Sequence, residues 1–557
     1  MSKKGVVISV EQYIYFQNRK CLLAKLFHEG EKLMLRQDLI APTTYNIVDE
    51  IERFAKDGEK IALIIEHESQ HTEKITYARL IKRAFKVANT FVDFGLQKGD
   101  VVIMMVPRSF EAYALYIGAL KAGLVIIPSS ELLRAKDIEY RLQHAEAKAI
   151  VTFEENLHQF DGVEGLQDVL RFIADTKVDG WISIFDEADK RDVNYTGEAT
   201  NSDDLAFLAY TSGTTGNPKA AMHRHAWGYA HLRTAAKHWL GVKEDSIVWA
   251  TAAPGWQKWI WSPFLAVLGS GATAFVYTGK FDPRRYLQLL EQFGVNALCC
   301  TPTEYRMMAK EPNLSEFKLQ QLHSAVSAGE PLNREVIETF QREFNVTVRD
   351  GYGQTENTLL IGTVIGMEMR PGSMGKATPG NTVAVIDEDG QPLPVGQIGD
   401  IAVHKSVPAL FTGYYKDPER TAMQFRGDWY VTGDRAVQDE DGYFWFEGRS
   451  DDIIISSGYT IGPFEVEDAL TKHPAVRECA VVASPDEVRG AIVKAFVILV
   501  DESLKTSPTI ISELQEHVKK LTAPYKYPRK IEFLEGLPKT ISGKIRRVEL
   551  RKAEYSR

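Results

Sequence analysis

The chain has 557 residues, of which 44% are hydrophobic and 25% charged, and it carries a formal net charge of -9 at pH 7. Its length exceeds what one hydrophobic core usually supports, so we expect a large domain and at least one smaller domain. The balance of apolar and charged residues is that of a globular protein and excludes a fibrous or disorder-dominated chain.

The first residues of the chain do not resemble a secretory signal, because polar residues interrupt their apolar run. No later stretch has the roughly 18 unbroken apolar residues that a membrane helix needs. The four cysteines, Cys21, Cys299, Cys300 and Cys479, show no metal-ligand or redox spacing. We therefore expect a cytoplasmic protein without membrane insertion.

Strand-like and helical segments alternate in the first half of the chain. Apolar runs predict strands, and helical patterns predict the helices between them, in the order 100–106, 109–123, 124–129, 136–147 and 148–153. A similar alternation returns between Ile247 and Cys300. Strands separated by helices at this spacing favour βαβ units and a parallel sheet.

The pattern changes near residue 380. Short strand-like runs at 383–405 and 443–449 are separated by turn residues, which is typical of an antiparallel sheet or a small barrel. Mixed strands and helices resume after "RSDD" (449–452). The predicted fold is α/β, with α/β layers and a small β-barrel in residues 1–450 and a small mobile α+β domain in residues 451–557.

The segment 519–552 is basic, with 11 Lys or Arg residues against 3 Glu. Such asymmetry indicates an anionic partner, although a solvated basic face without a ligand fits as well. One short patch on an acidic protein does not favour nucleic-acid binding.

A loop rich in glycine and hydroxyl groups, "TSGTTGNPK", follows the strand-like "LAFLAY". Its glycines allow successive N–H groups to turn toward an anion, and Lys219 adds a charge, so a triphosphate is the natural ligand. The spacing differs from that of the Walker loop, and on composition alone a turn without a ligand fits nearly as well. The predicted phosphate-binding residues are Thr211, Ser212, Gly213, Thr214, Thr215, Gly216 and Lys219.

Six ordered motifs resemble those of the adenylate-forming (ANL) enzymes, which include acyl-CoA synthetases, firefly luciferase and the adenylation domains of peptide synthetases. They are "YTSGTTGNPKAAMH" (210–223), "SAGEPL" (327–332), "GYGQTE" (351–356), "YVTGD" (430–434), "GRSDDIIISSGYTIGPFEVE" (448–467) and "PKTISGKIRR" (538–547). The resemblance runs from about residue 45 to the end and is strongest to the medium-chain acyl-CoA synthetases.

This resemblance implies an acid–thiol ligase with ATP, Mg²⁺ and CoA as cofactors. A carboxylic acid and ATP would give acyl-AMP and pyrophosphate, and CoA would then displace AMP to give acyl-CoA. Lys544 would bridge the carboxylate and the α-phosphate, Thr355 would hydrogen-bond a phosphate oxygen, and Glu356 would ligate Mg²⁺. Without the family resemblance, Lys544 would be interpreted as part of a solvated basic face, and "QTE" as an exposed turn.

The resemblance also places the nucleotide and CoA. Asp434 would accept the ribose hydroxyls, with Arg449 as a donor to the same sugar, although a turn aspartate is the simpler interpretation of Asp434. The other predicted nucleotide contacts are Gly329, Glu330, Pro331, Asp350, Gly351, Tyr352, Gly353 and Gln354. The predicted CoA contacts are Ser457, Gly458, Tyr459, Arg489, Tyr525, Lys526 and Tyr527.

After adenylation, the C-terminal domain would rotate about Asp451 so that the CoA thiol reaches the acyl carbonyl. The phosphates of ATP and CoA would then be the partners of the basic segment. One position departs from the pattern: Thr460 stands where similar enzymes have an arginine that contacts a phosphate. Loss of that contact would cost on the order of 1.5 to 3 kcal/mol if nothing compensates.

The acyl pocket is predicted from the residues before the Thr-Glu pair. Acetyl-specific relatives read "WWQTE" and close the pocket with an indole, whereas this chain has Tyr352 and Gly353. The open space would hold several methylenes, each worth about 0.8 kcal/mol when buried. We therefore expect a medium-length, branched or aromatic acid, with Trp256 bordering the pocket together with Trp259 and Trp261, unless these rings are core.

Two other functions stay open. The chain could adenylate an acid for a separate carrier protein, or it could be a non-catalytic relative that binds a nucleotide or acyl-CoA. An oligomer is possible, and its state cannot be read from the sequence.

Overall fold

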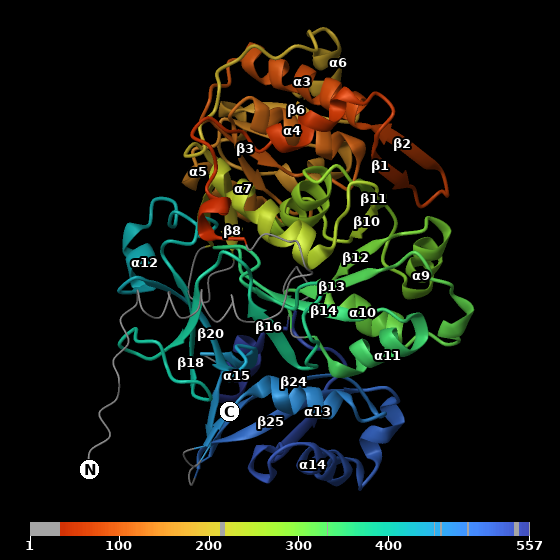
Figure 1. The fold of residues 1–557 in the computed structure, drawn as a ribbon, viewed down its shortest axis with the longest axis vertical. Coiled ribbons are helices and arrows are strands. Elements are labelled where there is room, and N and C mark those ends of the chain that lie inside the picture. The colour runs from red at the N-terminus through yellow and green to blue at the C-terminus, as the bar shows by residue number, and fades with distance from the viewer. Residues whose placement is uncertain are drawn as a thin grey trace.

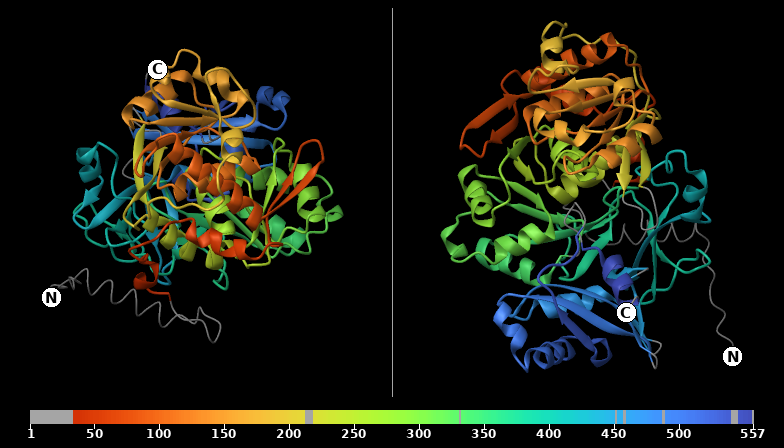
Figure 2. Two further views of the ribbon diagram at one scale, coloured as in Figure 1. Left: turned by 90° about the horizontal axis from the view of Figure 1, so that it is seen from above. Right: turned by 180° about the vertical axis from the view of Figure 1, so that it is seen from behind.

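The computed structural model describes residues 34–211, 218–330, 332–450, 452–456, 459–486, 489–539 and 545–555. These stretches form a large mixed α/β body, and the C-terminal strands and helices gather at one end of it (Figures 1 and 2). The predicted α/β class with a small C-terminal domain is confirmed.

The first sheet, as far as the structure describes it, has seven strands in the order β7-β6-β5-β3-β4-β8-β9, and its pairs are parallel except β8 with β9. The strands are β3 (Val101–Met104), β4 (Val125–Pro128), β5 (Ala149–Thr152), β6 (Leu170–Ile173), β7 (Ile182–Ser183), β8 (Leu205–Thr211) and β9 (Lys219–Arg224). The nearby helices are α3 (Tyr77–Asp93), α4 (Phe110–Lys121), α5 (Ala135–His144) and α6 (Ile184–Asp189). The β8–β9 hairpin pairs Thr211 with Lys219 and so brings together the ends of the predicted phosphate loop.

The second sheet follows one hydrogen-bonded path, β17-β18-β20-β21-β16-β15-β14-β13-β12-β10-β11-β1-β2. Its first strands along the chain are β1 (Ile61–Glu66), β2 (Thr72–Thr76), β10 (Ile247–Ala250), β11 (Thr273–Tyr277), β12 (Ala297–Cys300), β13 (Ser324–Ala328) and β14 (Val348–Tyr352). The rest are β15 (Ile361–Gly362), β16 (Ser373–Ala377), β17 (Val383–Ile386), β18 (Ile398–His404), β19 (Phe425–Arg426), β20 (Trp429–Gln438) and β21 (Phe444–Arg449). The pairing changes from parallel to antiparallel between β14 and β15, so the "GYGQTE" motif lies at this seam.

Helices cover the second sheet and connect it to the first (Figure 1). They are α2 (Asp49–Glu52), α7 (His225–Ala235), α8 (Gln257–Trp259), α9 (Pro283–Gln292), α10 (Pro302–Ala309), α11 (Arg334–Phe344) and α12 (Pro418–Met423). Two π-helical stretches, Ala236–Leu240 and Ile260–Ala266, continue α7 and α8. Short 3₁₀ turns occupy Arg36–Leu39, Arg53–Lys56, Glu154–Phe160, Leu166–Asp168, Leu314–Glu316, Glu502–Thr506 and Pro524–Lys526.

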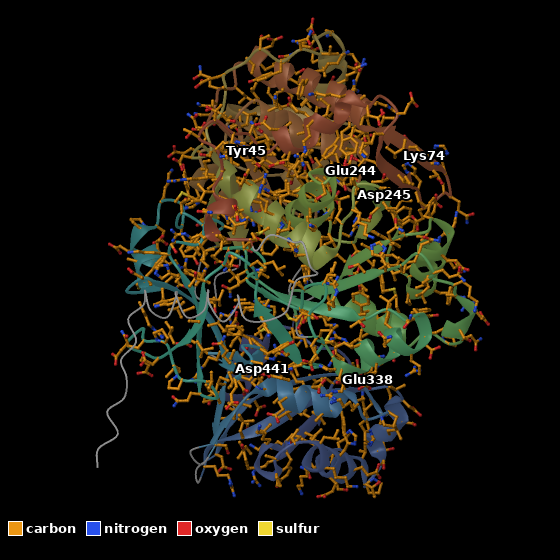
Figure 3. All side chains as sticks on the ribbon, viewed as in Figure 1. Tyr45, Lys74, Glu244, Asp245, Glu338 and Asp441 are labelled. Carbon is orange, nitrogen blue, oxygen red and sulfur yellow. The ribbon has the colours of Figure 1, made fainter. Side chains whose placement is uncertain are left out.

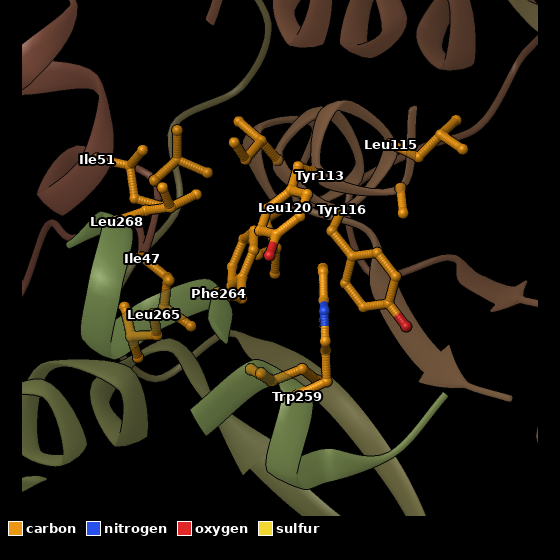
Figure 4. Packing of buried hydrophobic residues seen from close by; sticks show 14 of the residues in the cluster. Ile47, Ile51, Tyr113, Leu115, Tyr116, Leu120, Trp259, Phe264, Leu265 and Leu268 are labelled. Carbon is orange, nitrogen blue, oxygen red and sulfur yellow. The ribbon is translucent and has the colours of Figure 1, made fainter. Parts of the chain in front are cut away.

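A buried aromatic cluster joins the first sheet to the second. Trp259 packs against Tyr113 and Tyr116 of α4, with ring centroids 4.9 and 4.7 Å apart, and against Phe264 at 5.3 Å (Figure 4). Trp259 is 1% exposed, so it belongs to the core rather than to an open tunnel.

Tyr45 is also buried, whereas Lys74, Glu244, Asp245, Glu338 and Asp441 are exposed (Figure 3).

As far as they are described, the C-terminal elements form two small sheets: β22 pairs antiparallel with β23, and β24 pairs antiparallel with β25, which pairs parallel with β26. They are β22 (Ile454–Ser456), β23 (Tyr459–Ile461), α13 (Pro463–Thr471), β24 (Val476–Asp486), β25 (Gly490–Leu499), α14 (Ile510–Leu521), β26 (Lys530–Phe533) and α15 (Arg547–Tyr555). None of the helices in the described stretches combines the length and apolar character that crossing a bilayer requires.

A buried ionic network fixes the last helix to the sheet of β24, β25 and β26. Lys494 of β25 lies 2.5 Å from Glu554 of α15 and 2.6 Å from Glu532 of β26. Ser484 of β24 donates its hydroxyl hydrogen to Glu554 at 2.9 Å. Lys494 and Glu554 are 4% and 7% exposed, so these charges depend on one another for stabilisation.

Candidate active site

The end of the phosphate loop meets the "GYGQTE" loop at Lys219. Its ammonium lies 3.0 Å from Glu356 Oε1, and it also donates to the hydroxyl of Tyr414. Tyr414 in turn donates to Glu356 Oε1 at 2.8 Å, and burial raises the pKa of this phenol well above its ordinary value. Glu356 is only 6% exposed, so a buried carboxylate, an ammonium and a phenol share one point.

The loop after β14 is held in shape by its own hydrogen bonds. The Gln354 N–H donates to Asn357 Oδ1 at 2.8 Å, and the Asn357 N–H donates to the Gln354 carbonyl at 3.1 Å. The Phe411 N–H donates to the Glu356 carbonyl at 2.7 Å. Thr355 and Glu356 are therefore presented from a turn whose backbone is bound on both sides.

Asp434 of β20 is surrounded by hydrogen-bond donors. Tyr352 donates its hydroxyl hydrogen to Asp434 Oδ2 at 2.6 Å, and Gln354 donates from Nε2 to the same oxygen at 2.7 Å. Arg449, the register partner of Asp434 on β21, lies 3.5 Å from Oδ1. Asp434 is 6% exposed, and such a carboxylate is well suited to accept hydroxyl groups.

The end of β14 packs closely on Trp239. The Trp239 indole N–H donates to the Asp350 carbonyl at 3.0 Å, and a Cβ on Gly351 would lie 2.5 Å from the Trp239 ring. Only glycine therefore fits at 351. The Asp350 carboxylate accepts from the Gly351 N–H at 2.8 Å, and burial raises the pKa of Asp350 to about 7.

The "SAGEPL" loop connects the site to the C-terminal elements. Gly329 has a φ of +105°, which favours glycine. Glu330 accepts from the Thr303 hydroxyl at 3.1 Å and lies 3.5 Å from Arg306. Arg306 also donates to Asn333 at 3.0 Å, and Asn333 donates to Asp468 of α13 at 3.2 Å.

The open space predicted at Gly353 is not found, because the Thr358 backbone fills the place where a side chain at 353 would lie. A Cβ there would lie 2.0 Å from the Thr358 carbonyl oxygen and 3.3 Å from the Trp261 ring. Trp261 is buried, and Trp256 is half-buried. The Lys258 ammonium lies 5.0 Å from the centroid of the Trp239 ring and 5.6 Å from that of Trp261, so a cation and two indoles border this point.

Several predicted CoA contacts have partners within the C-terminal elements. Lys526 is paired with Glu465, Tyr527 accepts from Arg529 at 2.7 Å, and the Arg489 N–H donates to Asp486 at 2.9 Å. Tyr459 begins β23, and Tyr525 is 38% exposed.

Other cations of the basic segment also pair with carboxylates, as Arg547 does with Glu467 at 2.6 Å and Lys539 with Glu478 at 2.8 Å. Part of the local positive charge is therefore neutralised inside the domain. Ten predicted residues lie outside the described ones: Ser212, Gly213, Thr214, Thr215, Gly216, Pro331, Asp451, Ser457, Gly458 and Lys544.

Two known protein families match the chain. The AMP-binding enzyme family matches residues 51–415, and the AMP-binding enzyme C-terminal domain matches residues 465–544. The chain belongs to the AMP-binding enzymes, as an AMP-forming acyl-CoA ligase. The ligase is 58% identical to the uncharacterized acyl-CoA ligase YtcI of Bacillus subtilis (strain 168), over 94% of this chain and 98% of that protein. It is 43% identical to the mitochondrial acyl-coenzyme A synthetase ACSM3 of Mus musculus, over 84% and 82%.

Solved structures share the fold of the ligase. The anthranilate CoA ligase AuaEII in complex with anthranoyl-AMP aligns with a TM-score of 0.86 at 29% identity, covering 94% of this chain and 99% of that one. An acyl-CoA synthetase from Brucella canis aligns with a TM-score of 0.71 at 35% identity, covering 93% and 96%. The ligase thus binds ATP, CoA and a carboxylic acid as an adenylating enzyme of this family.

Sequence reasoning missed Tyr414, Trp239 and Lys258 as parts of the site of the ligase. Tyr414 is 195 residues from Lys219 along the chain, and no local pattern links them. Trp239 lies on a π-helical stretch, a feature that is common at functional sites but has no clear sequence pattern. Lys258 lies in "GWQKWIW", where the tryptophans are the more distinctive residues.

Acid is expected to destabilise the ligase through its buried histidines. Burial lowers the pKa of His225 to about 4, whereas an unfolded chain protonates histidine near pH 6.5. The folded state therefore binds fewer protons in this window, and stability that is present above pH 6.5 falls as the pH drops toward 4. Each such histidine contributes a slope of about 1.4 kcal/mol per pH unit.

Denaturant unfolding of the ligase at several pH values measures this slope. The His225→Asn variant keeps an acceptor for the Ile47 N–H, which His225 Nδ1 accepts at 3.1 Å. Its unfolding free energy should fall less steeply between pH 6.5 and 4 than that of the wild type. Equal slopes for the two proteins would contradict the expectation.

Proposed function

We propose that the ligase converts a medium-chain, branched or aromatic carboxylic acid into its CoA thioester. The acid attacks the α-phosphorus of ATP and expels pyrophosphate, and the CoA thiol then displaces AMP from the acyl adenylate. The observation that supports this proposal is the convergence of three distant motifs at the end of β14. Lys219 meets Glu356 there at 3.0 Å, and Tyr352 meets Asp434 at 2.6 Å.

In the first step, the loop ending at Lys219 binds the β- and γ-phosphates, and Thr355 donates to a phosphate oxygen. The described residues contain no group of three or more His, Cys, Asp or Glu side chains that could hold a metal alone. Mg²⁺ is commonly bound by one or two protein carboxylates together with phosphate oxygens of the substrate, and the buried Glu356 fits this role. Bound there, Mg²⁺ would offset the negative charge of the triphosphate.

The ribose lies on Asp434, and Arg449 is close enough to donate to the same sugar. Adenine lies between the Gly329–Glu330 turn and the backbone of Asp350 to Tyr352. Glycine at 351 lets the Trp239 ring pack directly against this backbone, because a side chain there would overlap the ring.

The C-terminal domain, residues 451–557, acts in both steps. In adenylation it supplies Lys544, whose charge offsets the repulsion between the carboxylate and the α-phosphate. For the second step it rotates about Asp451 and offers the segment at Ser457–Tyr459 to pantetheine. Arg489 and the 525–527 segment contact the CoA nucleotide, and Arg489 is our candidate to replace the arginine that is absent at Thr460.

The acyl group lies near Trp256 and Trp261, but not where a side chain at Gly353 would lie, because the Thr358 carbonyl oxygen occupies that position. Two structural relatives are named for aromatic acids, anthranilate and benzoate, which supports an acid larger than acetate as the substrate. We place the ligase in the cytoplasm. The support is its cysteine usage, since Cys299, Cys300 and Cys479 are buried free thiols.

A panel of acids tests the proposal directly. Pyrophosphate release should require ATP, Mg²⁺ and an acid, and it should be faster with medium-chain, branched or benzoic acids than with acetate. Acyl-CoA should form when CoA is added. A large preference for acetate would contradict the pocket assignment, and a thioester formed only on a carrier protein would favour that alternative. No pyrophosphate with any acid would favour a non-catalytic binding protein.

A further inference from the structure

Three buried rings, His223, Trp227 and His231, form a stack against the loop that carries Thr355 and Glu356. We call them the ring stack. They occur at every fourth residue, from the end of β9 into α7. The ring centroids of His223 and Trp227 are 5.1 Å apart, and those of Trp227 and His231 are 4.9 Å apart at an interplanar angle of 8°.

Each ring makes a hydrogen bond to the loop, in the order of the chain. His223 Nε2 lies 2.6 Å from the carbonyl oxygen of Thr355, and Trp227 donates from Nε1 to the carbonyl of Asn357 at 2.8 Å. His231 Nδ1 lies 2.7 Å from the hydroxyl of Thr358. The loop is thus bound at three nearby residues by one face of a single segment.

The chemistry of the partners fixes the hydrogens on both histidines. A carbonyl oxygen only accepts, so His223 carries its hydrogen on Nε2. His231 also donates from Nε2, to the Trp261 carbonyl at 3.1 Å, so its Nδ1 accepts from Thr358. Burial lowers the pKa of His223 to about 4 and that of His231 to about 3, so both rings are neutral at pH 7.

Simple core packing does not account for these contacts. Phenylalanine or leucine would fill the same space, since no ring of the stack is more than 2% exposed. The ring stack instead directs a polar atom at each of three loop positions. One of these bonds is to Thr355 itself, and the loop between the bonds contains Glu356.

We propose that the ring stack is a positioning element for adenylation, which fixes the 355–358 loop so that Thr355 and Glu356 face the triphosphate and its metal. This inference rests on the roles proposed above for these two residues. Because the β- and γ-phosphates leave as pyrophosphate, the second step no longer needs Glu356 as a ligand of the metal that they share. A defect in the ring stack therefore acts on the first step and spares the second.

The test compares the two half-reactions of the full-length ligase. His223→Leu should lower pyrophosphate release roughly tenfold, as expected for one lost buried hydrogen bond. It should raise the Mg²⁺ concentration needed for half-maximal release several-fold. Acyl-CoA formation from supplied acyl-AMP and CoA should stay within about twofold of wild type. His223→Gln, which can place an N–H at the same point, should recover most of the loss.

His225→Leu is the matched control. His225 is also fully buried and also makes one ring hydrogen bond, but to the Ile47 N–H instead of the loop. It should leave the Mg²⁺ requirement and the ratio of the two half-reactions at the wild-type values. If His223→Leu slows both half-reactions equally, or matches His225→Leu in its Mg²⁺ requirement, the ring stack is only structural.

Glu356→Gln separates this inference from the proposed function. If Glu356→Gln leaves the Mg²⁺ requirement unchanged, the metal role of Glu356 is wrong. If Glu356→Gln raises the requirement and His223→Leu does not, only the positioning role is wrong. Trp227→Phe keeps a ring but removes the donor to Asn357, so it should reproduce the Mg²⁺ effect in weaker form.

Discussion

Lys544→Ala is expected to slow acyl-adenylate formation at least about a hundredfold, the cost of removing one preorganised charge from a transition state. The acid and the α-phosphate are both anions, and we assign Lys544 to the space between them. The described residues on either side of 540–544 pair with one another. Lys539 bridges Ile545, and the Arg546 N–H donates to the Pro538 carbonyl at 2.8 Å.

Pyrophosphate release and thioester formation from supplied acyl-AMP are measured separately for this variant. The second activity should persist, because the adenylate already carries the bond that Lys544 helps to form. Lys539→Ala is the control, since Lys539 pairs with the partly exposed Glu478 at 2.8 Å and should leave both activities nearly unchanged. Equal loss of both half-reactions in Lys544→Ala would contradict this division of labour.

Lys494→Met is expected to destabilise the C-terminal domain by about 3 to 5 kcal/mol, since removing one partner of a buried ion pair leaves an uncompensated charge. Lys494 lies 2.5 Å from Glu554 and 2.6 Å from Glu532, and the side chains of Lys494 and Glu554 are 5% and 4% exposed. Hydrogen exchange of β24, β25 and α15 should accelerate. Tryptophan fluorescence would miss this change, because every tryptophan precedes residue 450.

Two further variants check the cause. Arg546→Met removes a cation that lies 2.5 Å from Glu549 with both side chains more than 40% exposed, so it should cost no more than about 1 kcal/mol. Adding Glu554→Gln to Lys494→Met should recover part of the lost protection, because the remaining partner is then neutral. An Arg546→Met effect as large as that of Lys494→Met would show that burial is not the reason.

Local patterns predicted the first sheet well. The β3-α4-β4-α5-β5 series lies within three residues of the predicted boundaries, because each element is a short run with its own periodicity. The mixture of strands and helices expected after residue 450 is also found, whereas β22, β23, β26 and α15 were not predicted individually. The joining of the parallel and antiparallel strands into one sheet was not predicted, because it depends on the two-residue strand β15, which has no sequence pattern of its own.

The sequence motifs named many of the residues that meet at the candidate site. The pairing of Tyr352 and Gln354 with Asp434, and of Lys219 with Glu356, joins residues that were all named from motifs. Tyr414 and the ring stack were missed, because the contacts of Tyr414 with Lys219 and of the ring stack with the 355–358 loop join residues more than 120 positions apart in the chain. The contacts of the ring stack form only when the β9–α7 segment packs against the seam of the second sheet, so no local pattern predicts them.

The hydrogen-bond donors around Asp434 would couple nucleotide binding to the segment that follows β21. Its carboxylate already accepts from Tyr352 and Gln354 and lies 3.5 Å from Arg449, so under the ribose role proposed for Asp434 the sugar hydroxyls would compete with these donors. Arg449 ends β21, and the Asp452 N–H three residues beyond the strand donates to its carbonyl at 3.0 Å. Ribose binding and the conformation of the segment after β21 would then be thermodynamically coupled. A change in that conformation that alters the free energy of ribose binding must itself be favoured or opposed by ribose by the same free energy.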